Sequence, residues 1–249
     1  PDGRELGFHE FYEKLRAGGG AKTAAANAEE FLALMEPALA AGIDVLYLGF
    51  SSALSSTYSI GAMTAAQLAE KYPERRIYAV DTLCASFGQG LLVYLAAQQR
   101  LQGKNIDEVR AYVEQIRPQL CHWFTVDDLQ HLKRGGRVSA AAAAFGTVLN
   151  IKPILHVDDE GRLIPVNKVQ GRITSIKALA KRMQETAIDP DGQVVFISHG
   201  DCEKEAEKLA EIVRESIGAK EIVINPIGPI VGAHSGPGTI ALFFLGTKR

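Results

Sequence analysis

Residues 43–71, IDVLYLGFSSALSSTYSIGAMTAAQLAEK, decide the fold class of this chain. The apolar run Ile43 to Leu48 predicts a buried strand, and the apolar residues from Ser59 to Lys71 recur at the spacing of one helix face. The segment between them, Gly49 to Tyr58, is therefore a turn from a strand into a helix. Five hydroxyl side chains lie in this turn: Ser51, Ser52, Ser55, Ser56 and Thr57.

This hydroxyl-rich turn has two interpretations. A helix N-terminus presents free backbone N–H groups, which together with hydroxyl groups would suit a carboxylate or a phosphate. Serine and threonine also cap helices and close turns without binding any ligand. The rest of the sequence has to distinguish a binding site from a capped turn.

The same strand-to-helix pattern recurs further along the chain. Ile77 to Val80 predicts a second strand, Asp81 to Ser86 a second hydroxyl-bearing turn, and Ala85 to Arg100 a helix that is apolar on nearly all sides. Strands that alternate with helices predict a parallel sheet, with ligands bound beyond the carboxyl ends of the strands. Both turns would lie at that edge, which favours a binding site. Gly88 and Gly90 weaken the helix, so we expect another helix or a ligand to pack closely there.

The chain is predicted to be an α/β protein of two domains that meet near Pro118. Before this proline, further helices are expected from Phe8 to Leu15, from the N-cap Asn27 to Ala41, and from the N-cap Asn105 to Ile116. Residues 1–118 are thus expected to form a Rossmann-like domain with a parallel sheet.

In residues 119–249 strands and helices no longer alternate regularly, which predicts an α+β domain with a mixed sheet. A hairpin with its turn at Asp158 to Gly161 comes early, and strand-helix crossovers follow it. The expected strands are His122–Val126, Ile151–Val157, Leu163–Val169, Val194–Ser198, Glu221–Asn225 and Ile240–Leu245. The expected helices are Asp127–Lys133, the alanine-rich Ser139–Phe145, Ile173–Ala187 and Glu203–Ile217.

Composition excludes several classes of function. The 249 residues are 47% hydrophobic and 22% charged, with a net charge of −2, so the chain has no basic footprint for nucleic acid. Its three cysteines, Cys84, Cys121 and Cys202, are far apart and have no zinc-site spacing, which fits a reducing cytoplasm. No membrane span or signal peptide is visible, although the sequence begins at Pro1 without a methionine.

Two further features carry candidate chemistry. Gly228 to Gly238 contains four glycines and two prolines, which predicts an irregular, sharply turned loop around His234. An imidazole among small residues and hydroxyls can bind an anion or move a proton near neutral pH, although a lone histidine is often structural. Arg137 and Arg172 each adjoin a glycine turn, where a guanidinium is either a solvated surface charge or a clamp for a carboxylate or phosphate.

Other catalytic and cofactor motifs are missing from the sequence. It contains no GxGxxG, Walker A, HExxH or GxSxG pattern. Cys84 at a predicted helix N-terminus has no evident base to activate it. We therefore expect no metal and no cofactor.

Taken together, several segments resemble the DegV family of bacterial fatty-acid-binding proteins, which includes the acyl-binding subunit of bacterial fatty acid kinase. The matching segments, in order, are SSALSSTYSIGAM, AVDTLCASFGQGLLV, DDLQHLKRGGRVSAAAA, LNIKPIL, KVQGR, SHGD and IGPIVGAHSGPGTIALFFLG. The resemblance runs from the first predicted helix to the C-terminus.

This resemblance implies a two-domain protein with one long-chain fatty acid buried between the domains. It implies that Thr23, Ser55 and His234 hold the carboxylate. Head-group neighbours of less defined role are Ser56, Thr57, Ser86 and Ser235. The arginines at the mouth or at the face that docks a kinase would be Arg137 and Arg172. An ATP-binding kinase is the implied partner, with at most transient membrane contact.

The sequence departs from the family at two places. The family opens with a strand and an Asp-Ser-rich loop, about forty residues that would precede Pro1, so the first domain is expected to lack a strand and part of its pocket wall. Ala24-Ala25-Ala26 replaces the family's Ser-Gln-Pro, so one hydroxyl and one amide near Thr23 are missing.

Three hypotheses for function follow. The first is a non-catalytic carrier that binds a long-chain fatty acid and presents its carboxylate to a separate kinase. The second is an enzyme that acts on a small carbonyl or phosphorylated metabolite, with His234 as acid/base or covalent anchor. A carrier needs a long dry tunnel and the enzyme a small wet cleft, so the pocket distinguishes them. The third is a fold that has lost its ligand.

Overall fold

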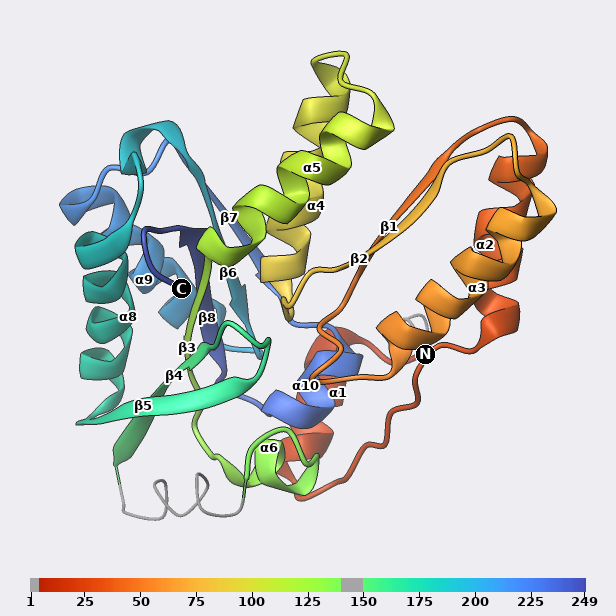
Figure 1. The fold of residues 1–249 in the computed structure, drawn as a ribbon. Coiled ribbons are helices and arrows are strands. Elements are labelled where there is room, and N and C mark those ends of the chain that lie inside the picture. The colour runs from red at the N-terminus through yellow and green to blue at the C-terminus, as the bar shows by residue number, and fades with distance from the viewer. Residues whose placement is uncertain (1–4, 140–149) are drawn as a thin grey trace.

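The computed structural model describes residues 5–139 and 150–249. Most of its helices and strands form five layers, which Figure 1 shows from left to right: helices, a six-stranded sheet, helices, a two-stranded sheet and helices. The predicted α/β class, with a parallel sheet in the first half and a mixed sheet in the second, is therefore confirmed.

The small sheet pairs β1 (Val45–Gly49) in parallel with β2 (Ile77–Asp81). Helices α2 (Ala28–Ala40) and α3 (Thr57–Lys71) pack on one face of it through an apolar cluster of their own. As predicted, Asn27 caps α2. The hydroxyl-rich turn thus connects the C-terminal end of β1, at Gly49, to the start of α3.

The large sheet has the strand order β5-β4-β3-β8-β6-β7, and only β6 and β7 pair in parallel. Its strands are β3 (Leu120–Thr125), β4 (Ile151–Val157), β5 (Leu163–Gln170), β6 (Val194–His199), β7 (Glu221–Pro226) and β8 (Ile240–Leu245). The predicted hairpin is β4 and β5, although one residue in β5 interrupts the register opposite Ile154 and Leu155.

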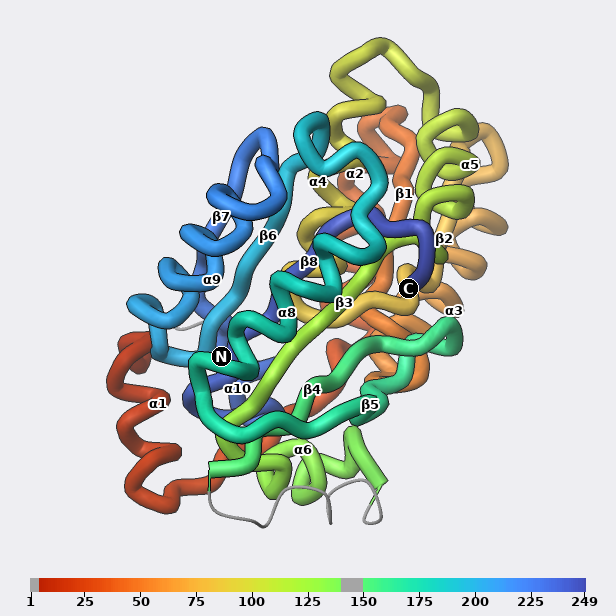
Figure 2. The backbone as a smooth tube through the Cα atoms, turned by 90° about the vertical axis from the view of Figure 1, so that its left-hand side faces the viewer, coloured from red at the N-terminus to blue at the C-terminus, as the bar shows by residue number. Residues whose placement is uncertain are grey.

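Helices cover both faces of the large sheet. One face is covered by α8 (Arg172–Thr186) and α9 (Glu203–Ser216), which lie in front of the strands in Figure 2. The other face is covered by α4 (Phe87–Leu101) and α5 (Ile106–Ile116), which separate the two sheets. Asn105 caps α5 through a capping box, as predicted. Short 3₁₀ turns span Arg117–Gln119 and Pro190–Gly192.

Helix α1 (Phe8–Arg16) packs on the second half of the chain. Phe11, Tyr12 and Leu15 form an apolar cluster with Ala233 of α10 (Pro229–Ser235). The connection from α1 to α2 then crosses from the large-sheet half to the small-sheet half (Figure 1). We call residues 17–27 of this connection the strap.

The structure corrects two predictions. The segment expected to be an irregular loop contains the helix α10, because Pro229 at the first helical position has the φ angle a helix needs and Gly228 precedes it as N-cap. The close packing expected at Gly88 and Gly90 is present, but the nearest groups are the His122 side chain of β3 and the ring of Phe87 in the same helix. A Cβ atom on Gly88 would lie 2.0 Å from His122 Nε2, and one on Gly90 would lie 2.8 Å from the ring of Phe87. The alanine-rich helix predicted at Ser139–Phe145 lies almost wholly outside the described residues.

Candidate functional site

A cavity of about 330 Å³ lies above the α4 face of the large sheet. Alternate residues of two neighbouring strands form its floor: His122 and Phe124 of β3, and Ala241 and Phe243 of β8. Its apolar walls come from the turn after β1, from α6 (Gln130–Arg134), from the β4–β5 hairpin and from α10. The wall residues are Phe50, Leu54, Leu132, Val157, Leu163, Ile227, Ile230 and Val231.

Hydroxyl groups and an imidazole gather at one part of this apolar cavity. Thr23 Oγ1 of the strap lies 2.7 Å from His234 Nε2 of α10. In the turn before α3, Ser55 Oγ lies 2.9 Å from Thr57 Oγ1 and accepts a hydrogen bond of 3.2 Å from the backbone N–H of Thr57. These four side chains all line the cavity. They offer hydroxyl and imidazole donors to a ligand oxygen at its polar end.

The imidazole of His234 is held close against glycine backbone. A Cβ atom on Gly135 would lie 2.2 Å from His234 Nδ1, so any other residue at this position would force the imidazole to move. His234 Nδ1 is buried and has no hydrogen-bond partner among the described residues. Burial and, next, the nearby positive charge of Arg137 lower the pKa of His234. The imidazole is therefore neutral at pH 7 and can donate one hydrogen bond.

Arg137 brings a positive charge to the same end of the cavity. Its Nε donates to the carbonyl of Leu54 at 3.0 Å, and its guanidinium also donates to the carbonyl of Gly135. Within residues 5–139 and 150–249, no carboxylate forms an ion pair with it. Its charge thus remains available to an anion at the cavity.

Comparisons with known proteins agree on one family. A family model described as "Uncharacterised protein, DegV family" matches residues 1–247. The chain belongs to the DegV family. A DegV domain-containing protein of Clostridium perfringens is 48% identical over 245 residues, which are 98% of this chain and 84% of that relative.

Solved DegV structures share this fold. A fatty-acid-binding DegV family protein from Thermus thermophilus superposes with a TM-score of 0.86 at 29% identity, over 98% of this chain and 86% of that one. The Streptococcus pneumoniae fatty acid kinase B3 protein loaded with linoleic acid superposes with a TM-score of 0.86 at 20% identity, over 97% and 84% of the two chains. At that identity the second likeness shows the fold alone.

Most of the residues predicted from the DegV resemblance meet at the cavity. The lining includes Thr23, Ser55, Ser56, Thr57, Ser86, Arg137, His234 and Ser235. Arg172 does not belong to the lining. Its guanidinium pairs with Glu205 at 3.0 Å and donates to the carbonyl of Gly238 at 2.6 Å, and its side chain is 15% exposed. In this structure Arg172 ties α8 to α9 and to the loop before β8.

Sequence reasoning missed the floor of the DegV cavity. Phe124, Ala241 and Phe243 lie within two strands that the sequence predicts, and alternation along each strand was the one signal that could have placed them on a common face. His122 was also missed. The one sequence signal for His122 was Gly88, because the missing side chain at position 88 leaves room for the His122 ring.

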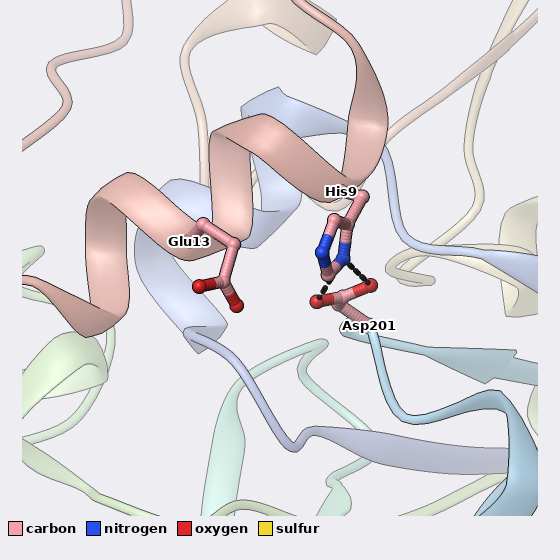
Figure 3. Close-up of side chains that lie close together, drawn as sticks. All are labelled: His9, Glu13 and Asp201. Atoms are coloured by element: carbon pink, nitrogen blue, oxygen red, sulfur yellow. Dashed lines mark hydrogen bonds and ion pairs between the residues drawn. The ribbon is translucent and has the colours of Figure 1, made fainter.

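A second cluster, outside the cavity, has the composition of a metal site. His9 and Glu13 of α1 lie near Asp201, as Figure 3 shows. His9 Nδ1 lies 3.0 Å from both Asp201 carboxylate oxygens. Arg16 donates to Glu13 at 2.6 Å and also to Asp201. Because the Arg16 guanidinium already pairs with both carboxylates and His9 with one of them, we interpret the cluster as an ion-pair network that fastens α1 to the loop after β6.

The described helices give no sign of a membrane span. Within residues 5–139 and 150–249, none has the length and apolar character needed to cross a bilayer.

Proposed function

We propose that this protein binds one long-chain fatty acid in the cavity, with the carboxylate at Thr23, Ser55 and His234. The observation that carries the proposal is the division of the cavity into a large apolar part and one cluster of hydroxyls, imidazole and guanidinium. An ionised carboxylate needs such donors, and an alkyl chain needs apolar walls. Related DegV structures described as fatty-acid-binding support the same ligand class.

Burial of the chain supplies enough free energy for this binding. Each buried methylene contributes about 0.8 kcal/mol, so a chain of about 16 carbons gains around 10 kcal/mol before ordering costs. The head-group cluster then has to fix orientation rather than supply affinity. Neutral donors suit this role, because they avoid the desolvation cost of a fully buried salt bridge.

We further propose that a separate ATP-binding kinase phosphorylates the bound carboxylate. Arg137, Leu54 and Leu163 line both the cavity and a neighbouring depression that also contains Gly136 and Arg162. A partner bound over this depression would reach the head group beside the Arg137 guanidinium, which pairs with no carboxylate of the described residues and can stabilise phosphoryl charge. The sequence has no nucleotide-binding motif of its own that we recognise, so the ATP site is assigned to the partner. Docking by Arg172 remains a prediction.

The alternative, an enzyme for a small metabolite, has less support. His234 would need a group that orients it as an acid or base, but its only hydrogen bond to a described residue is with Thr23. The walls are also mostly apolar side chains, which would leave a small polar substrate without partners.

Mass spectrometry of the purified protein tests the proposed ligand. Native spectra, followed by spectra of an organic extract, should show one fatty acid for each chain. A protein that purifies empty and takes up none of a series of added fatty acids would reject the proposal. For the kinase, the test is formation of acyl phosphate when the loaded protein, ATP and a candidate kinase are combined.

A further inference from the structure

A serine on the sheet face below the cavity meets a serine at the start of α4. Phe124 of β3 is paired across the sheet with Ala241 of β8, which is paired in turn with Ser198 of β6. Ser198 lies on the same face as Phe196, two residues before it, and that face packs against α4. Ser198 is 1% exposed, and its hydroxyl lies 3.1 Å from Ser86 Oγ at the start of α4. Of the two serines, Ser86 lines the cavity.

The hydroxyl pair has hydrogen-bonding capacity that no described residue uses. Each hydroxyl has one hydrogen to donate, and the Ser86–Ser198 bond uses only one of the two. Neither side chain has another hydrogen bond to the described residues. A hydroxyl hydrogen without a partner in apolar surroundings is costly, so a polar group of a ligand would be favoured there.

The other polar group of this face is already satisfied. His122 is 2% exposed, and its Nδ1 lies 3.1 Å from the carbonyl of Leu120. Its Nε2 accepts the backbone N–H of Ala85 at 3.3 Å. His122 therefore has no free donor for a ligand, which leaves the serine pair as the polar spot of the floor.

The backbone conformation of Ser86 also indicates a functional role for its side chain. Its φ of +51° is a conformation that side-chain-bearing residues rarely adopt, and its hydroxyl does not cap α4. Such strain often marks a functional position. A strained serine between a strand and a helix also resembles the nucleophile of hydrolases, but no histidine nitrogen of the described chain is hydrogen-bonded to Ser86 Oγ. We therefore interpret Ser86 as a binding group and not as a nucleophile.

We propose that Ser86 and Ser198 form a second polar subsite, which accepts an oxygen substituent on the acyl chain, as in a hydroxy fatty acid. No hydrogen bond joins this pair to the Thr23–His234 or Ser55–Thr57 pairs in the described structure. The proposal assigns the carboxylate to those two pairs and the chain oxygen to the serine pair. This inference rests on the proposed function, because it requires an acyl ligand.

The test compares octadecanoic acid with 10-hydroxyoctadecanoic and 12-hydroxyoctadecanoic acids, titrated into delipidated wild-type and Ser86→Gly protein. Glycine adopts the backbone conformation of residue 86 without strain, so the variant loses the hydroxyl and keeps the fold. The quantity compared is a ratio: the dissociation constant of each hydroxy acid divided by that of octadecanoic acid. We expect this ratio to rise about tenfold in the variant for at least one hydroxy acid, because the ligand hydroxyl loses its buried partner.

Ser55→Ala is the matched control, since it removes a cavity hydroxyl from the head-group end. It should weaken all three acids by the same factor and leave the ratios unchanged. If Ser86→Gly behaves in the same way, or leaves every ratio as in the wild type, Ser86 recognises no chain oxygen and the inference is rejected. If wild-type protein binds none of the three acids, the proposed function fails together with the inference.

Discussion

His234 and Thr23, which share a hydrogen bond at the cavity, lie 211 residues apart in the chain. Their meeting depends on local space as much as on their own chemistry. Gly135 supplies that space for the imidazole, and Arg137, two residues later, brings the cation. One short turn after α6 therefore sets both the position and the electrostatic surroundings of His234.

Gly135→Ala tests this dependence on space. The new methyl group would overlap the imidazole, with Cβ 2.2 Å from Nδ1, so the ring must move away from Thr23. We expect fatty-acid affinity to fall about threefold, equivalent to about 0.7 kcal/mol, in a fluorescence titration, since the head-group end mainly orients the ligand. Gly20→Ala is the control, since a Cβ atom there has no heavy atom within 4 Å. Equal affinities of the two variants would show that the ring position does not matter.

His234→Ala separates binding from presentation of the carboxylate. Apolar burial supplies most of the affinity, so we expect a loss of less than about tenfold in binding. Acyl-phosphate formation with ATP and a partner kinase should fall much further, because the carboxylate is no longer held in one orientation. Turnover equal to wild type in that reconstituted assay would remove His234 from the mechanism.

At the scale of elements, α1 and α10 form one unit on which the head-group site depends. Tyr12 of α1 is fully buried, and its hydroxyl donates to the carbonyl of Ile227 at 2.8 Å. Its ring fills the space beside Gly232 of α10, where a Cβ atom would lie 2.4 Å from the hydroxyl oxygen. Because the strap begins at the end of α1, the same helix also anchors the segment that carries Thr23.

Tyr12→Phe should weaken this unit. Loss of the hydroxyl leaves the Ile227 carbonyl buried without its partner, which costs about 1–3 kcal/mol. We expect that decrease in the free energy of unfolding by urea denaturation, together with weaker fatty-acid binding. Tyr72→Phe is the control: its hydroxyl donates to Glu36 at 3.1 Å near the surface, so its effect should be small. Similar losses in both variants would contradict a special role for the α1–α10 contact.

At the scale of the whole molecule, we expect buried and half-buried histidines to make stability depend on pH. Burial is the first cause that lowers the pKa of His122, His156 and His199, and it does the same for His131 and His234. The unfolded chain therefore binds more protons than the folded one below about pH 6.5. His9 has the opposite shift, because Asp201 raises its pKa, but it is exposed.

We expect the free energy of unfolding to fall as the pH is lowered from 7.5 to 5, above the range in which most carboxylates titrate. Urea denaturation at several pH values measures this slope. His9→Gln should leave the fall in place, since the side chain of His9 is 74% exposed and its pKa is shifted upward. A stability that is constant or rises toward pH 5 would show that the buried histidines do not control the slope.

Much of the fold follows from the sequence because its causes are local. The capping box of Asn105, the apolar run of β8 and the turn at Asp158 depend on residues within a few positions of one another. The same locality explains the error at α10, where glycines and prolines were read as a loop although Pro229 begins a helix.

The sequence by itself determined the α/β class, the family resemblance and the hydroxyls, imidazole and arginine that gather at the cavity. Only the tertiary structure decided that Arg137 reaches the cavity while Arg172 pairs with Glu205, that α1 supports α10, and that Ser86 at the start of α4 meets Ser198 of β6. The physical reason is that helix and turn signals act between near neighbours, whereas these contacts join distant segments. Packing, which no local pattern encodes, selects them.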